Sequence, residues 1–109
     1  MKDDKLYLIH ISECIERVES YVHDVDKNAF LESSLIQDAV IRNLQVMAES
    51  TQRLSDKNKD NQPHIDWLKI SGFRNVLVHD YLGVDPLRVW NIILNELPVL
   101  KKAIREMMR

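Results

Sequence analysis

Residues 74–81 bring together side chains that could act on a phosphodiester bond. The segment reads Arg-Asn-Val-Leu-Val-His-Asp-Tyr, so a cation, an amide, an imidazole and a phenol occur within eight residues. Arginine stays charged at any biological pH, and its planar guanidinium matches the geometry of a phosphate. Histidine accepts or donates a proton near neutrality. These residue types indicate phosphodiester chemistry without a metal, with Arg74 and His79 as the candidate catalytic residues.

Helical geometry limits how these side chains could cooperate. Asn75 lies four residues before His79 and shares one side of a helix with it. Arg74 and Tyr81, seven residues apart, share another side. Arg74 and His79 would then lie about 140° apart, too far to reach one atom from a straight helix. Either the helix ends near His79, where Gly83 is a suitable C-terminal residue, or two copies of the segment face each other across a dimer axis.

A structural interpretation of the same residues stays open. An arginine and a histidine near a helix end often serve as a surface charge and a cap, because cations favour the C-terminal end of the helix dipole. Tyr81 could simply pack against Trp67 or Trp90. Spacing alone does not decide between these two interpretations, since short motifs recur by accident.

The composition predicts one all-α domain over residues 1–109. Hydrophobic residues make up 45% of the chain, whereas there are only two glycines and three prolines. Sheets need frequent turns, so this scarcity favours long helices. A single cysteine, the lack of a ~20-residue apolar run and the absence of a signal peptide lead us to expect a soluble cytoplasmic protein without membrane contact.

The charge balance gives no overall electrostatic case for nucleic acid binding, because the formal net charge is −2. RNA contact would need a local basic patch. The candidates for it are Arg42, Arg53, Lys57, Lys59 and Lys69.

The spacing of apolar residues at threes and fours predicts four helices. The first begins near Asp3 or Asp4 and runs to about residue 25. The second follows Asp26 and continues to about Leu54, a length of about 40 Å. Residues 55–62 are polar and predict a loop, after which Pro63 opens the third helix with Trp67 and Ile70 facing inward. Gly72 marks a kink or a close backbone approach in that helix.

Asp85 and Pro86 predict the start of the fourth helix, as N-cap and first residue. Its expected apolar stripe is Leu87, Trp90, Leu94 and Leu97. Pro98 cannot donate to the carbonyl of Leu94, so the helix should break there. The sequence therefore predicts an up-and-down four-helix bundle with a broken last helix.

Other reactive residue types are interpreted as structural. Cys14 falls beside the apolar stripe of the first helix and is expected to be a small core residue. Trp67 and Trp90 are expected in the core rather than stacked on bases. No metal site is expected, because the remaining histidines show no ligand spacing with His79. They are His10, His23 and His64.

The chain resembles the HEPN superfamily, and specifically the HepT-like toxins, along nearly its whole length. The resemblance rests on residues 35–44, on Trp67, on the run from Phe73 to Tyr81, and on Val89-Trp90 near Leu97-Pro98. One departure is that residues 48–50 are Ala-Glu-Ser where the family commonly has Gly-Glu-Ala. The extra methyl group bears on helix packing more than on chemistry.

This resemblance implies a homodimeric, metal-independent endoribonuclease that needs no cofactor and acts as the toxin of a toxin–antitoxin pair. The family's Arg-x4-His-x-Tyr motif corresponds to Arg74, His79 and Tyr81, with Asn75 in support. The partner it implies is a minimal nucleotidyltransferase antitoxin, which silences the toxin by attaching AMP to the motif tyrosine, here Tyr81. A dimer that joins two motifs would resolve the angular separation of Arg74 and His79.

Two other classes of function remain. In a non-catalytic HEPN module, Arg74 and His79 would bind the phosphates of a nucleotide or contact a partner protein. In a purely structural helical dimer, the motif would be a coincidence. The presence of all four motif residues favours the ribonuclease.

Overall fold

The computed structural model describes the backbone of residues 4–79 and 84–109, and the side chains of residues 4–73 and 84–109. Within these ranges every regular element is a helix, which confirms the all-α prediction. None of these described helices is both long enough and apolar enough to span a membrane. The elements are α1 (Asp4–Val22), α2 (Lys27–Glu32), α3 (Ser34–Gln52), α4 (Asp56–Asp60), α5 (Trp67–His79), α6 (Pro86–Asn91), the π-helix η1 (Ile92–Glu96) and α7 (Leu97–Met107).

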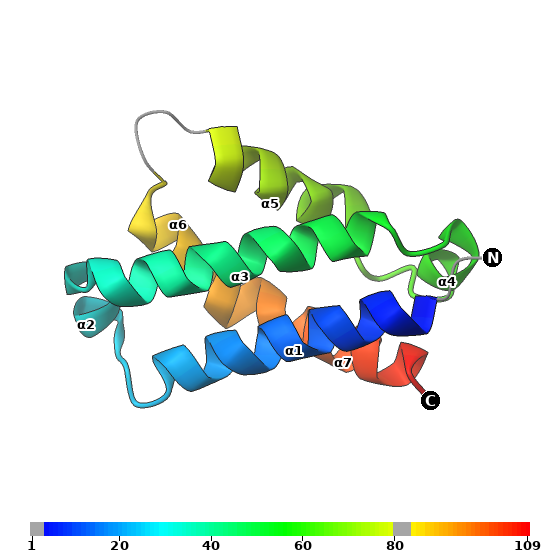
Figure 1. The fold of residues 1–109 in the computed structure, drawn as a ribbon, viewed down its shortest axis with the longest axis horizontal. Coiled ribbons are helices and arrows are strands. Elements are labelled where there is room, and N and C mark those ends of the chain that lie inside the picture. The colour runs from blue at the N-terminus through cyan, green and yellow to red at the C-terminus, as the bar shows by residue number, and fades with distance from the viewer. Residues whose placement is uncertain (1–3, 80–83) are drawn as a thin grey trace.

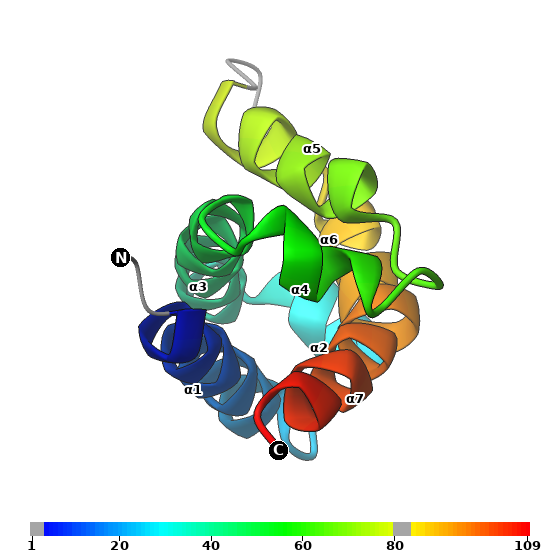
Figure 2. The same cartoon turned by 90° about the vertical axis from the view of Figure 1, so that its right-hand side faces the viewer.

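The long helices lie side by side, and neighbours run in opposite directions (Figure 1). Helices α1 and α3 share the most extensive contact, and α3 also packs against α5. The end-on view in Figure 2 shows α1, α3 and α7 around a common interior, with α5 at the outer edge of the molecule. Helix α5 is therefore held mainly from one side, by α3.

The apolar stripes of the first two predicted helices form the core. Ile11, Ile15 and Val18 of α1 are buried, as are Val40 and Leu44 of α3. Cys14 is also buried, at 2% exposure, which confirms its expected place in the core. Burial raises the pKa of the Cys14 thiol, which lowers the fraction of nucleophilic thiolate.

The predicted second helix is in fact two helices, because the chain turns at Ser33. This residue has extended backbone angles, and its hydroxyl accepts a hydrogen bond from the backbone N–H of Ile36 (3.1 Å), as an N-cap does. The side chain of Gln37 donates to the carbonyls of Phe30 (2.9 Å) and Leu31 (3.1 Å) at the end of α2, where the Phe30 carbonyl also accepts from the Ser33 backbone N–H (3.2 Å). The turn buries Phe30 completely against Trp90, with ring centroids 5.1 Å apart. The prediction of a single helix was wrong because tertiary burial of Phe30 outweighs the periodic pattern.

The boundaries of the middle segment also differ from the prediction. The expected loop at residues 55–62 contains the short helix α4, whose N-cap Ser55 accepts a hydrogen bond from the backbone N–H of Asn58 (3.3 Å). Helix α5 begins at Trp67 rather than at Pro63. The carboxylate of Asp66 accepts a hydrogen bond from the backbone N–H of Lys69 (3.0 Å), so Asp66 provides the stronger start signal.

Asp4 connects the first turn of α1 to α4. Its Oδ2 atom accepts hydrogen bonds from the Ser55 hydroxyl (2.7 Å), the Ser55 backbone N–H (3.1 Å) and the Asn58 amide (2.6 Å). Burial alone would raise the pKa of Asp4, but these hydrogen bonds to the carboxylate outweigh it and lower the pKa below its ordinary value of 3.8. The ionised carboxylate therefore stabilises this contact.

We expect Asp4→Ala to lower the free energy of unfolding by about 1 kcal/mol at neutral pH, near the low end for bonds to a charge because the site is partly solvated. Since the folded-state pKa is lowered, this stabilisation is present above pH 3.8 and is lost as the pH falls through the folded-state pKa. Urea unfolding at several pH values measures it. Asp38→Ala is the control, because the exposed side chain of Asp38 makes no hydrogen bond or ion pair within the described part of the chain. Equal losses for both variants, independent of pH, would contradict the role of Asp4.

The chain stays helical from Pro86 to Met107, and the change predicted at Pro98 takes the form of the π-helical segment η1 just before it. The backbone N–H of Leu97 bonds to the carbonyl of Ile92, five residues earlier, which is the π pattern. The predicted stripe was partly wrong, since Leu87 and Leu94 are exposed at 40% and 53%. The buried residues of this region are Val89, Trp90, Ile92, Ile93 and Leu97. The region is apolar on several sides, so the sequence offered more than one possible stripe, and the π turn changes which side faces inward.

Candidate active site

Helix α5 carries three of the four residues of the predicted site. Arg74, Asn75 and His79 lie in its C-terminal half. The side chains of these three residues, and the whole of Tyr81, lie outside the described part of the structure. The continuous helix between residues 74 and 79 keeps the backbone positions of Arg74 and His79 about 140° apart. One copy of α5 therefore presents these two positions on different sides.

The N-terminal half of α5 fixes the helix on the rest of the molecule. Ile70 and Phe73 are each 5% exposed and belong to the core. Trp67 is half-buried, and its indole Nε1–H donates to the carbonyl of Lys59 (3.1 Å). The expected inward position of Ile70 is confirmed, and Trp67 packs against the core rather than standing free as a base-stacking platform. The motif thus follows two turns of firmly held helix.

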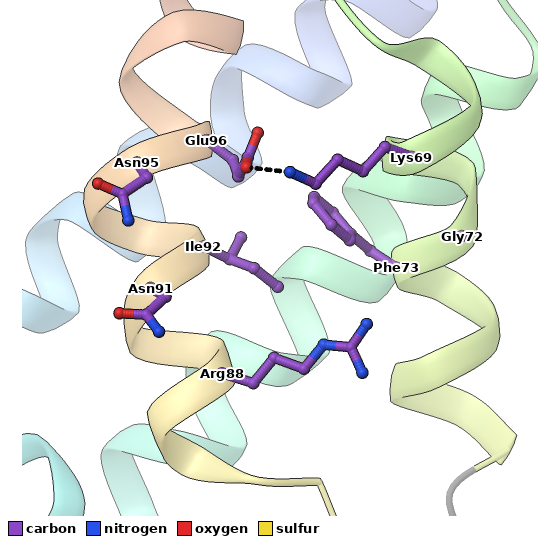
Figure 3. A pocket seen from close by; sticks show the side chains of 8 residues that line it. All are labelled: Lys69, Gly72, Phe73, Arg88, Asn91, Ile92, Asn95 and Glu96. Atoms are coloured by element: carbon purple, nitrogen blue, oxygen red, sulfur yellow. Dashed lines mark hydrogen bonds and ion pairs between the residues drawn. The ribbon is translucent and has the colours of Figure 1, made fainter.

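A pocket of about 400 Å³ separates α5 from α6 and η1 (Figure 3). Its lining is Lys69, Gly72, Phe73, Arg88, Asn91, Ile92, Asn95 and Glu96. The prediction of a close backbone approach at Gly72 is wrong within one chain. A Cβ atom at this position would meet no atom within 4 Å beyond its own stretch of helix. Gly72 instead leaves one wall of this pocket open.

Charges in the pocket are only partly balanced. The Lys69 Nζ atom forms an ion pair with Glu96 Oε1 at 2.6 Å, which joins α5 to η1 across the pocket. Arg88 extends from α6 toward α5 (Figure 3). Its exposed side chain forms no ion pair with a residue of the described ranges. Among the described lining residues there are two cations and one anion, and Arg88 is the cation that none of them pairs.

Sequence reasoning missed Arg88, Asn91 and Asn95 as possible binding residues. Their spacing of three and four places them on one side of the predicted fourth helix. That signal was visible in the sequence, but a polar helix side is usually a solvated surface. Only the position of α5 opposite this side turns it into the wall of a pocket.

The other histidines and the second tryptophan occupy structural or surface positions. His10, His23 and His64 are exposed, and His23 lies 3.4 Å from Asp24. Trp90 is 8% exposed and packs on Phe30, as expected for a core residue. Among the residues with described side chains, no three histidine, cysteine, aspartate or glutamate residues gather as metal ligands would.

The candidate basic patch is partly neutralised. Arg53 forms an ion pair with Glu49 at 3.6 Å, and Lys69 is paired with Glu96. Lys57 lies on α4, whereas Arg42 lies on α3. Because these cations are spread over separate elements, the described structure offers Arg88 as a better placed cation beside α5.

The family and the relatives to which this chain is similar all carry ribonuclease names. A model of the family described as Ribonuclease HepT-like matches residues 11–107. A Methanocaldococcus jannaschii protein, named as a gamma-glutamylcyclotransferase and candidate RNase, is 36% identical over 107 residues. The match covers 98% of this chain and 48% of that protein, so the chain spans about half the length of this relative.

Two further relatives match over nearly their whole length. One, also from Methanocaldococcus jannaschii and named as a candidate RNase, is 31% identical over 103 residues, with 94% of both chains covered. The other, named "probable ribonuclease HepT", comes from Thermococcus cleftensis and is 32% identical over 100 residues, covering 92% of this chain and 91% of that protein. No solved structure matches the chain.

Proposed function

Because the chain belongs to the HepT-like ribonuclease family, we propose that it is a toxin endoribonuclease that cuts RNA without a metal ion. The observation that carries the proposal is the family match over residues 11–107, within which the Arg-Asn-x3-His-x-Tyr pattern is complete. The helix α5, which contains Arg74, Asn75 and His79, supports it by placing them on one element.

In the proposed reaction, a ribose 2′-hydroxyl attacks its own 3′-phosphate. His79 accepts the hydroxyl proton as the O2′–P bond forms, and the P–O5′ bond breaks. The leaving O5′ atom takes a proton from a protonated imidazole, for which the partner's His79 is available in a dimer. Arg74 stabilises charge on the phosphoryl oxygens, while Asn75 holds the imidazole or the phosphate. The products are a 2′,3′-cyclic phosphate and a 5′-hydroxyl.

The proposed active form is a homodimer of up-and-down, HEPN-like bundles, each built from α1, α3, α5 and the α6–η1–α7 helix. Two observations support it. The angular separation of Arg74 and His79 on α5 calls for a second copy to complete the site. Leu35 near the start of α3 and Leu68 near the start of α5 are 80% and 86% exposed, so each offers one apolar side chain to a second copy. Light scattering measures the dimer, and a monomer with full cleavage activity would contradict it.

Cleavage should continue in excess EDTA, because Arg74 and His79 provide the charge and the proton transfer that a metal would otherwise supply. The measurement is the cleavage rate of a labelled RNA by the purified protein, with and without chelator. Loss of activity in EDTA and recovery with added magnesium would instead indicate a metal-dependent mechanism. An intact, folded dimer that cuts no RNA under either condition would favour the non-catalytic, phosphate-binding alternative.

We further propose that a nucleotidyltransferase antitoxin inhibits the protein by attaching AMP to Tyr81. The phosphate of AMP would place negative charge near Arg74 and occupy space that RNA needs. Co-expression with such an antitoxin should add mass in AMP units at Tyr81 and abolish cleavage, as measured by intact-mass analysis and peptide mapping. The exposed Tyr21 should stay unmodified, and Tyr81→Phe should prevent the addition. A fully inhibited complex with unmodified Tyr81 would mean that inhibition is steric.

A further inference from the structure

The pocket between α5 and the α6–η1 helix lies on the same helix as the proposed catalytic residues. Gly72 lines this pocket, and His79 follows it by seven residues. Seven residues are about two turns, so the two backbone positions lie on the same side of α5, about 10 Å apart along its axis. One RNA strand bound at His79 could therefore continue into the pocket.

Arg88 gives the pocket the chemistry of a phosphate site. Its guanidinium reaches across from α6 toward α5 (Figure 3) and has no acidic partner among the residues whose side chains are described. Arginine binds phosphate through two parallel N–H groups, which fixes orientation as well as charge. An exposed arginine at the mouth of a pocket, without an ion pair to any residue of the described ranges, can contact the RNA backbone.

The ion pair between Lys69 and Glu96 limits the positive charge beside Arg88. At 2.6 Å the two side chains neutralise one another, and they are 54% and 34% exposed. Removal of the carboxylate would release Lys69 toward the same pocket. The charge in the pocket can therefore be tested in both directions, since removal of the Glu96 carboxylate should strengthen RNA binding and removal of the Arg88 guanidinium should weaken it.

The pocket also has room and surfaces for a base. Phe73 and Ile92 are 5% and 7% exposed and form its apolar floor, while Asn91 and Asn95 line it with amides that point away from α5 in Figure 3. Bases of single-stranded RNA bind proteins through their faces on apolar groups and through hydrogen bonds at their edges. The volume of about 400 Å³ falls within the usual range for small-molecule sites. Helix η1, a π-helix of a kind frequent at functional sites, supplies three of the lining residues.

We propose that this pocket binds a nucleotide of single-stranded RNA adjacent to the cleaved bond, with Arg88 contacting its phosphate and the apolar floor holding its base. The proposal rests on the proposed ribonuclease function and adds to it the class of RNA and the residues that select it. In this proposal Arg88 binds the substrate, whereas His79 and Arg74 act on the reacting phosphate.

The test uses the full-length protein and a short fluorescent single-stranded oligonucleotide, 2′-O-methylated throughout, which binds but cannot be cut. Arg88→Ala should weaken binding about tenfold. It should also lower the slope of log binding constant against log salt concentration by about 0.7, the value for one lost phosphate contact on a single strand. Arg88→Lys keeps the charge but loses the planar guanidinium, so its RNA affinity should lie between those of the unmodified protein and Arg88→Ala. Glu96→Gln should tighten binding severalfold. Arg105→Ala is the matched control, an exposed arginine on α7 that should leave binding unchanged.

With a cleavable RNA, Arg88→Ala should raise KM and leave kcat close to that of the unmodified protein, because a binding contact is lost equally from ground and transition states. Normal probe binding by Arg88→Ala, together with normal cleavage, would overturn the pocket proposal and leave the ribonuclease intact. If the probe binds in a way that depends on Arg88 but the protein cuts no RNA, the pocket proposal stands and the ribonuclease proposal falls. A change of oligomeric state in Arg88→Ala, without a change in RNA affinity per dimer, would show that the pocket is a protein–protein contact. No probe binding by the unmodified protein would also overturn the proposal.

Discussion

His79→Ala should reduce the rate of RNA cleavage by about 10²–10⁴, the usual contribution of a general acid or base. The change should appear in kcat, because proton transfer contributes only in the transition state. Alanine is a strong helix former, so α5 should persist. The measurement is single-turnover cleavage of a labelled RNA at saturating protein, with circular dichroism and light scattering to verify fold and assembly.

Arg74→Ala should reduce the rate of RNA cleavage by about 10²–10³, because it removes one contact to the charge that develops on the phosphoryl oxygens. Exposed residues of the same types provide the controls. His64→Ala and Arg105→Ala should cleave RNA at the unmodified rate. If His79→Ala retains full activity while folded and dimeric, the proposed catalytic role of the α5 motif is wrong.

Phe30→Ala should lower the free energy of unfolding by about 3–5 kcal/mol. Phe30 is completely buried and packs on Trp90, so the substitution leaves a cavity where α2 meets α6. A domain of this size has only about 5–15 kcal/mol of stability, so the loss is a large share of the total. The expected result is a melting temperature lower by more than about 10 °C.

The neighbouring residue supplies a matched control for Phe30. Leu31, on the same short helix, is 37% exposed, and Leu31→Ala should cost less than about 1 kcal/mol. Urea unfolding of both variants compares them directly. Equal losses would show that α2 contributes little to the core, and the turn at Ser33 would then lack its energetic explanation.

The helical class and most of the core were predictable because they depend on local periodicity. Ile11, Ile15 and Val18 recur at threes and fours, and so do Val40 and Leu44. The break at Ser33 was not predictable in this way, although serine is a good N-cap. The apolar stripe of α3 starts only after this residue, so periodicity alone does not mark the turn, and the burial of Phe30 against a helix about 60 residues later gives the chain a reason to turn.

The candidate site was predictable only in part, for a similar reason. The motif residues are close in sequence, so their common helix followed from local pattern. The pocket beside them needs Lys69 of α5 and Glu96 of η1 to meet across the fold. Arg88 is separated from Gly72 by the whole segment that joins α5 to α6. Sequence periodicity cannot report a contact of that kind.

The mass of the RNA fragments produced in EDTA tests the central claim most directly. Attack by a neighbouring 2′-hydroxyl leaves a 2′,3′-cyclic phosphate on the upstream fragment, which is lighter by one water than a linear phosphate. The account predicts cyclic ends with the unmodified protein, no product with His79→Ala, and no cut where the attacking hydroxyl is replaced by hydrogen. Cleavage at that 2′-deoxy position, with a linear 3′- or 5′-phosphate end, would contradict it.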